Sequence, residues 1–395
     1  MAEKIHKYGP YKEFHTPLFS DHQWWGLAWA RAFVATNDKS YLNRSVQVFD
    51  YIALHGWDEK VCGGGVTWCP VPTNPYKNAI TVELFVSLAM ALHPFASISE
   101  KGATYYSDWA RKGWEWIRSS GLINSQWLLN DGLNGATCKN NGQTTWTYNQ
   151  GVLLSGLYRL TRATGDPAPL QAALQIANAT MYFLVVDGIL TEPCPGGVCG
   201  SDGQIFKGMF VKHLGYMLEE DAENPLLPSW FVQQAIGFLA RNARSMLTAD
   251  ACTDGGFGFR WDGSDCDVET TATDSAALDL FTATAVSGAA VSPTFTWEVS
   301  GLGNCQDSSG KSMSNCFSAD IEFFACRDAA FANPGAQAFD FHLECLAGGK
   351  GFCRVRTLSG AQSCGGGFQY EQGAATNVSE GDGSALTLCY LRAGP

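Results

Sequence analysis

The residues best suited to chemistry form one run near the start of the chain, Ser20-Asp21-His22-Gln23-Trp24-Trp25. A carboxylate at a helix start beside two tryptophans suits acid–base chemistry on a glycoside, since aromatic faces pack well against sugar rings. The run also fits a purely structural role. Ser20 as N-cap with Gln23 three residues later would form a capping box, and Asp21 in the first turn would complement the helix dipole.

Five further segments combine aromatic or amide side chains with glycine, and each lies in or beside a long polar loop. Amide groups offer planar donors and acceptors to sugar hydroxyls, and an aromatic side chain offers a floor for the ring. One such segment alone is more often a turn with a helix cap, but five at the same end of a helical array favour a sugar site. The candidate binding residues are Trp25, Asn78, Glu83, Asp131, Tyr148, Asn149, Gln150, Lys207 and Trp261.

Composition narrows the class of partner. The net charge of −12 argues against an electrostatic interaction with nucleic acid or an anionic membrane. No stretch approaches the roughly 18 apolar residues of a membrane span. The sequence shows no metal-ligand cluster among its seven histidines, no phosphate-binding loop and no G-x-S-x-G motif, so we expect no metal and no cofactor. Its 13 Trp, 13 Tyr and 23 Phe residues favour a neutral partner such as an oligosaccharide.

Helical periodicity, with apolar residues three and four positions apart, occurs in nine stretches. We place the helices at residues 21–36, 40–55, 78–92, 103–120, 149–164, 168–185, 207–221, 228–247 and 271–286. Short connections alternate strictly with long, glycine-rich ones. In an antiparallel array this alternation puts every long loop, and the starts of alternate helices, at one end. The pattern predicts an all-α domain, an α/α toroid with a binding mouth at one rim.

The cysteines indicate an oxidising compartment. Seven of the 14 cysteines precede residue 270 and seven follow residue 300, so each part of the chain has an odd number. None forms a C-x-x-C pair, and the set therefore fits disulfides better than a zinc site. Three N-x-S/T sequons, at Asn43, Asn178 and Asn377, agree with a secreted glycoprotein.

The end of the chain differs in composition from the helical part. It contains short alternating apolar runs separated by Gly, Ser and Cys, which is typical of a small disulfide-stapled β domain. We therefore predict an N-terminal lead-in at residues 1–19, a toroid at 20–287 and a Cys-rich, β-rich domain at 292–395. The sequence assigns no role to the last of these.

Seven motifs in order give the chain a resemblance to glycoside hydrolase family 76. They are WWGLAW (24–29), CGGG (62–65), YKNAITVELF (76–85), WEW (114–116), NDGL (130–133), TTWTYNQG (144–151) and CGSDGQIFKG (199–208). That family comprises fungal and bacterial endo-α-1,6-mannanases and related cell-wall mannoprotein transglycosidases. The resemblance covers residues 20–286 and implies an (α/α)6 barrel, which nine helices would leave incomplete at the N-terminus. It also implies α-mannan or another cell-wall oligosaccharide as partner, and a secreted or cell-wall location.

The resemblance also identifies a departure at the catalytic residues. The family uses two adjacent aspartates before the Trp-Trp pair as nucleophile and acid/base of a retaining mechanism. Asp21 matches the second, while Ser20 occupies the position of the first. Retaining hydrolysis needs two carboxyl groups about 5 to 5.5 Å apart, and a serine hydroxyl without a histidine base is a poor nucleophile. We therefore expect a protein that acts on or binds α-1,6-mannan with hydrolysis weakened, altered or lost.

Two other interpretations remain open. One is a catalytically inactive, lectin-like mannan-binding protein of the cell wall or the secreted fraction. The other is an enzyme that pairs Asp21 with a more distant carboxylate such as Glu83, Asp131 or Asp202. In every case an incomplete barrel would leave apolar surface on the first helices, so we expect aggregation or a dimer through them.

Overall fold

The computed structural model describes residues 18–69, 76–194, 199–253, 255–262 and 266–288, and the backbone of the strands between residues 296 and 393. The predicted lead-in, residues 1–19, lies outside the described residues except for its last two positions. The chain divides into two compact units. Unit 1 comprises Met1–Leu226 and Phe238–Ala289, and unit 2 comprises Leu227–Gly237 and Ala290–Pro395.

Helices make up most of unit 1, and the described residues contain the nine α-helices that the periodicity predicts. They are α2 (Phe19–Thr36), α3 (Lys39–His55), α4 (Ala79–Leu92), α5 (Tyr105–Ser120), α6 (Thr147–Thr164), α7 (Ala168–Phe183), α8 (Gly203–Glu223), α9 (Ser229–Ser245) and α10 (Thr271–Val286). Their bounds differ from the predicted ones by a few residues at the ends, and α9 is shared between the two units. A small hairpin, β1 (Val185–Val186) with β2 (Ile189–Leu190), precedes α8. No helix in the described ranges has the length and hydropathy of a membrane span.

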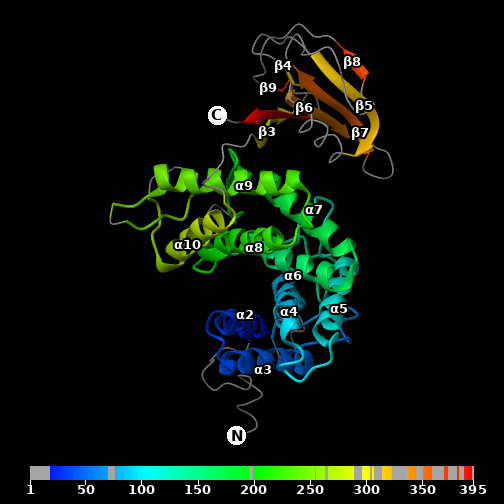
Figure 1. Ribbon diagram of the computed structural model, residues 1–395, viewed down its shortest axis with the longest axis vertical. Helices are drawn as coiled ribbons and strands as arrows, with labels where there is room; N and C mark the ends of the chain where they lie inside the picture. Colours follow the sequence, from blue (N-terminus) through cyan, green and yellow to red (C-terminus); the bar gives the residue numbers. More distant parts are fainter. Residues whose placement is uncertain are drawn as a thin grey trace. The chain divides into compact units, whose positions relative to one another are not determined.

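These helices form two layers. α2, α4, α6, α8 and α10 pack on one another in that order, while α3, α5 and α7 each pack on the helix that precedes them. Figure 1 shows this curved array running from α2 and α3 (blue) to α10 (yellow), with α2 and α10 at its two ends. The described helices therefore make an open curve of the α/α type rather than a closed ring.

Side-chain size and polarity decide which helix lies in which layer. α4 is apolar on all sides, and nearly every residue in it is buried, as expected for a helix packed on several neighbours. α5 instead carries charged residues on one face and buries the other. Glycines allow the closest approach in the inner layer, since a Cβ added to Gly208 on α8 would lie 2.6 Å from the Cα of Ala276 on α10.

Unit 2 contains a six-stranded antiparallel sheet with the strand order β3-β10-β6-β7-β5-β8. Its strands are β3 (Thr296–Leu302), β5 (Ser314–Glu322), β6 (Ala336–Leu343), β7 (Lys350–Thr357), β8 (Gln369–Glu371) and β10 (Thr387–Ala393). A second sheet pairs β4 (Cys305–Gln306) with β9 (Glu380–Gly381). The cysteine side chains of this segment lie outside the described residues, so its disulfides stay a prediction.

Candidate functional site

The starts of four inner helices border one large cavity of about 1480 Å³. The cavity continues along these helices to their C-terminal ends, where Arg31, His93 and Arg159 line it. We call the end at the helix starts the rim pocket. The side chains that define it are Ser20, Asp21, Trp24, Trp68, Tyr76, Asn78, Asp131, Tyr148, Asp202 and Phe206.

Ser20 and Asp21 lie in the first turn of α2 and both line the rim pocket. Ser20 is buried and Asp21 is half-buried. The predicted capping box is wrong, because α2 begins at Phe19 and the residue in the N-cap position, Leu18, has no side-chain hydrogen bond to offer. Gln23 instead donates from Nε2 to the carbonyl oxygen of Thr81 at 2.9 Å, which joins α2 to α4.

Asp131 is carried into the rim pocket by a loop that docks on the start of α4. The backbone N–H of Ala79 donates to the carbonyl oxygen of Asp131 at 2.8 Å. The Asp131 carboxylate accepts a hydrogen bond from the Tyr76 hydroxyl at 2.5 Å, and Asn141 donates from Nδ2 to the same hydroxyl at 2.9 Å. Burial, assisted by the charge of Asp131, raises the pKa of Tyr76, so this phenol stays protonated.

Aromatic side chains from α6 and α8 form another wall of the pocket. The rings of Tyr148 on α6 and Phe206 on α8 stack with centroids 3.9 Å apart and planes 10° apart. Trp146 contacts the Phe206 ring by its edge, at 5.5 Å. Burial, followed by the charges of Asp131 and Glu83, raises the pKa of Tyr148 well above its usual value, so its hydroxyl remains a neutral donor.

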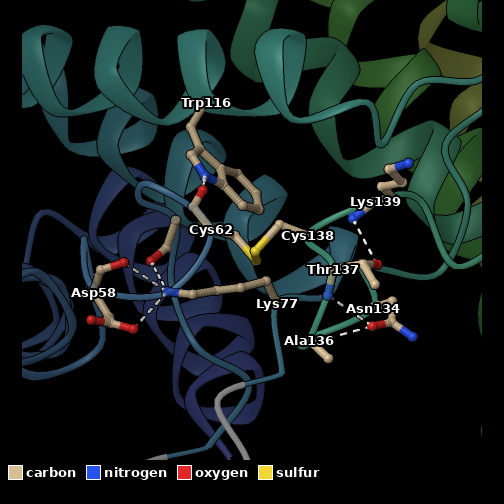
Figure 2. The surroundings of a disulfide bond; sticks show 10 residues. Asp58, Cys62, Lys77, Trp116, Asn134, Ala136, Thr137, Cys138 and Lys139 are labelled. Carbon is tan, nitrogen blue, oxygen red and sulfur yellow. Dashed lines mark hydrogen bonds and ion pairs between the residues drawn. A yellow bond between two sulfur atoms is a disulfide. The ribbon is translucent and has the colours of Figure 1, made fainter.

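A disulfide and a buried lysine hold the loops around the pocket. Cys62 and Cys138 join the loop before α4 to the loop before α6, and the Trp116 indole donates to the carbonyl oxygen of Cys62 at 2.9 Å (Figure 2). Lys77 donates to two backbone carbonyl oxygens of the first loop at 2.7 and 2.9 Å and lies 3.4 Å from the Asp58 carboxylate. Burial lowers the pKa of Lys77 to about 8. Because Lys77 lies between Tyr76 and Asn78, fixing it fixes both pocket residues.

The structure brings only part of the predicted binding set to the pocket. Asn78, Asp131 and Tyr148 line it together with Ser20 and Asp21. Trp25 does not, because it is half exposed and contacts Trp29, whereas Trp24 lines the pocket. Successive helical residues point about 100° apart, and the rotation of α2 that turns Trp24 towards the cavity leaves Trp25 outside it.

The other five predicted binding residues are buried behind the pocket wall. Gln150 accepts from the backbone N–H of Leu129 at 2.8 Å and donates to its carbonyl at 2.9 Å, so its amide is already occupied. Glu83 and Asn149 are fully buried without a hydrogen-bond partner in the described part of the chain. Lys207 and Trp261 pack on each other, with the Lys207 ammonium 4.5 Å from the indole centroid.

The pocket also contains aromatic residues that the sequence reasoning missed, namely Trp24, Trp68, Tyr76 and Phe206. Three of them belong to motifs already singled out, WWGLAW, YKNAITVELF and CGSDGQIFKG. Their motifs were therefore the available signal, but the residues that face the pocket within each motif depend on helix phase and loop docking. Among the described residues, Cys252, Cys266 and Glu269 place possible metal-ligand atoms within 4.8 Å of one another. Cys252 and Cys266 are joined in a disulfide, so their sulfur atoms are not free to bind a metal.

The sequence profile of glycosyl hydrolase family 76 matches residues 2–295, well over half of the chain. The chain belongs to glycosyl hydrolase family 76. Among curated relatives, mannan endo-1,6-alpha-mannosidase DCW1 of Saccharomyces cerevisiae is 29% identical over 285 residues, covering 67% of this chain and 62% of that protein. The DCW1 protein of Candida albicans is 28% identical, covering 58% of this chain and 54% of the relative. The chain thus spans less than two thirds of the length of these relatives.

Solved structures of family 76 share the fold of this member. The GH76A alpha-1,6-mannanase from Salegentibacter sp. HEL1_6 superposes with a TM-score of 0.60 at 23% identity, over 69% of this chain and 77% of that one. An inactive variant of that enzyme, in complex with alpha-1,6-mannotriose, superposes with a TM-score of 0.59 at 22% identity, over the same shares of the two chains. Dfg5 from Chaetomium thermophilum, in complex with glucosamine, gives a TM-score of 0.60 at 20% identity, over 72% and 73% of the two chains. The predicted helical class, of the α/α type, is thereby confirmed for the part of the chain that these structures cover.

Proposed function

We propose that this family 76 member binds α-1,6-linked mannose chains in the rim pocket, with Asp21 as its remaining catalytic carboxylate. The observation that carries the proposal is that Asp21 and the stacked Tyr148–Phe206 pair line the same cavity. A stacked aromatic surface suits the C–H face of a sugar ring, and a carboxylate at a helix start suits proton transfer at the glycosidic oxygen. The names of the relatives, mannan endo-1,6-alpha-mannosidases, support the choice of polymer.

The polar residues of the pocket complete the binding site in this proposal. Asn78 and Asp131 offer acceptors and donors to mannose hydroxyls, and the protonated Tyr76 holds Asp131 in one orientation. Ser20, at the position of the family nucleophile, has no carboxylate with which to form a glycosyl–enzyme bond. We therefore expect binding to be retained and hydrolysis to be weak, altered or lost.

A second candidate function, the lectin-like mannan-binding protein, is favoured by the state of the other carboxylates. Glu83 is buried outside the pocket, so it cannot serve as the distant partner of Asp21. Asp131 lines the pocket, but its carboxylate already accepts the Tyr76 hydrogen bond. Asp202 is the remaining candidate among the three that the sequence suggested.

We further propose that the protein is secreted or associated with the cell wall. Three disulfides, Cys62–Cys138, Cys194–Cys199 and Cys252–Cys266, support an oxidising compartment. Asn43 is exposed on α3 and could carry a glycan, whereas the Asn178 amide is buried in α7 and Asn377 lies outside the described residues. In this proposal residues 1–19 form a lead-in, residues 20–287 form the glycoside hydrolase-like domain, and residues 292–395 form a separate Cys-rich, β-rich domain.

Incubation with linear α-1,6-mannan and α-1,6-mannotetraose tests the proposal, with new reducing ends and bound oligosaccharide followed together. We expect the wild-type protein to bind mannotetraose and to release few or no reducing ends. Ser20→Asp should raise hydrolysis by about 10²-fold or more, because it restores the second carboxyl group of the retaining pair. The new carboxylate would be buried, and the helix start would offset part of its desolvation.

The outcomes separate the two candidate functions. Binding by both proteins without cleavage by either selects the lectin. If the wild-type protein hydrolyses mannan and Asp21→Asn retains that activity, Asp21 is not the catalytic carboxylate. If wild-type and Ser20→Asp proteins both fail to bind mannotetraose, the rim pocket is not a mannan site.

A further inference from the structure

Two pairs of consecutive residues connect the aromatic wall of the rim pocket to the interior. Tyr148 and Phe206 line the pocket, while their chain neighbours Thr147 and Lys207 are fully buried. Because consecutive helical residues point about 100° apart, each pair presents one side chain to the pocket and the other to the protein behind it. Whatever holds Thr147 and Lys207 therefore also sets the position of the stacked rings.

Glu192 holds Thr147. Its carboxylate accepts the backbone N–H of Thr147 at 2.9 Å and also accepts a short hydrogen bond from the Thr147 hydroxyl. Thr147 is the first residue of α6, and the N-cap residue, Trp146, supplies no side-chain cap. The negative charge that favours a helix start thus comes from a residue 45 positions further along the chain.

Lys207 is held on the other side of the same region. Its ammonium donates to the carbonyl oxygen of Phe259 and lies 4.5 Å from the ring centroids of both Phe259 and Trp261. These contacts join the first turns of α8 to the loop before α10. Glu192 is itself nearly fully buried and is attracted by the charge of Lys207.

We propose that Glu192 and Lys207 are positioning residues that hold the Tyr148–Phe206 stack in place from behind. This inference rests on the proposed function, in which that stack receives a mannose ring. Neither Glu192 nor Lys207 lines the cavity, so neither touches a sugar bound there. Their assembly with Trp261 gives a role to two residues that the sequence had placed in the binding site itself.

The charges around this assembly make it sensitive to pH. Burial raises the pKa of Glu192 to about 7, against the attraction of Lys207 and the hydrogen bonds from Thr147. Burial lowers the pKa of Lys207 to about 8, and the charges that act on the lysine are those of Glu192, Asp250, Asp267 and Asp262. Acidification through about pH 7 therefore neutralises Glu192 and weakens its hold on Thr147. We expect the affinity for mannotetraose to fall as the pH is lowered from 8 to 6.

The experiment compares Glu192→Gln with the wild-type protein by calorimetric titration of α-1,6-mannotetraose and by amide hydrogen exchange. Glu192→Gln keeps the shape but loses the charge, so affinity should drop about tenfold, and exchange at the start of α6 should accelerate. The affinity of this variant should also depend less on pH between 6 and 8 than that of the wild-type protein, with a remaining dependence from Asp250, whose pKa burial raises to about 7, and from Lys207. Asp50→Asn is the matched control, because Asp50 also accepts a hydrogen bond from a hydroxyl and also has a lysine nearby, but lies away from the pocket, on α3 near the start of α5.

Substitutions of Thr147, the hydrogen-bond partner of Glu192, test the same interaction in case Glu192→Gln does not fold. Thr147→Val removes the hydroxyl donor without changing the size of the side chain, and Thr147→Ser restores the donor. We expect Thr147→Val to reproduce the faster exchange and weaker binding, and Thr147→Ser to recover both. Affinity and exchange that stay at wild-type values in Glu192→Gln and Thr147→Val would overturn the positioning role.

The two readouts also separate this inference from the proposed function. If the wild-type protein binds no mannotetraose, the proposed function fails. The exchange at the start of α6, measured without any sugar, then still decides whether Glu192 holds that helix.

Discussion

At the scale of single residues, Glu83 is an ionisable side chain in a position that excludes water. It lies on the inner-layer helix α4, is fully buried, and has no side-chain hydrogen-bond partner among the described residues. Burial, with a smaller contribution from the charge of Asp131, raises the pKa of Glu83 well above its usual value. The folded protein therefore keeps a proton on Glu83 at pH values where the unfolded chain, with a pKa of about 4.3, has lost it.

This difference gives the stability a definite dependence on pH. Across the interval between the unfolded and the raised folded pKa, the folded state binds more protons than the unfolded state, so stability falls as the pH rises. We expect Glu83→Gln, which mimics the neutral acid, to lose less stability than the wild-type protein between about pH 5 and pH 7.5. Each pH unit over which the folded protein keeps this proton and the unfolded chain does not corresponds to about 1.4 kcal/mol.

Urea unfolding of both proteins at the two pH values measures this effect. Glu115→Gln serves as control, because Glu115 is exposed and pairs with Arg118 on the surface of α5. That variant should keep the pH dependence of the wild-type protein. An equal loss of stability in wild type and Glu83→Gln would show that Glu83 is ionised in the folded state.

At the scale of elements, the pocket depends on loops that are joined to one another more than on the helices alone. The Cys62–Cys138 disulfide closes a segment of 76 residues that includes α4, α5 and both loops around the pocket. Crosslinks of this length restrict the unfolded chain, and their removal costs about 2–4 kcal/mol. We expect the double variant Cys62→Ala/Cys138→Ala to lose about that much stability and to bind mannotetraose more weakly.

Equilibrium unfolding and calorimetric titration check this prediction. Cys69→Ala is the matched control, since Cys69 is a buried free cysteine in the same loop and its replacement leaves the disulfide intact. A small core truncation of this kind should cost about 1 kcal/mol and leave the affinity unchanged. If the double variant loses no more stability than Cys69→Ala, the disulfide does not stabilise the rim.

At the scale of the whole molecule, the two ends of the helical array in unit 1 expose apolar side chains. Trp25 on α2 is 50% exposed and Leu278 on α10 is 65% exposed. Because exposed apolar side chains favour association, we expect a concentration-dependent dimer or larger assembly, as the sequence suggested for the first helices. In the inner layer, α2 packs on α4 at one end and α10 packs on α8 at the other (Figure 1).

Sedimentation of charged variants tests this expectation. Trp25→Lys and Leu278→Lys each place a charge at one end of the array, and together they should shift the protein towards the monomer. Val186→Lys introduces the same charge at an exposed position of the β1–β2 hairpin and should leave the association unchanged. A wild-type protein that stays monomeric at every concentration contradicts the prediction.

The sequence by itself determined the helices and the end of the array at which the pocket lies. Both depend on local patterns: apolar residues three and four positions apart define each helix, and alternating loop lengths place the starts of α2, α4, α6 and α8 together. The same reasoning brought Ser20, Asp21, Asn78, Asp131 and Tyr148 to the site, because each lies at a helix start or in a long loop of that end.

Only the tertiary structure decided which neighbouring residues face the pocket and which support it. Trp24 rather than Trp25 lines the cavity because of the rotation of α2, which the spacing of apolar residues does not specify closely enough. Lys207 and Glu192 support the stack through contacts between residues 45 or more positions apart, such as Glu192 with Thr147 and Lys207 with Phe259. A pattern along the chain records local burial, whereas partners at that separation are set by how loops pack in three dimensions.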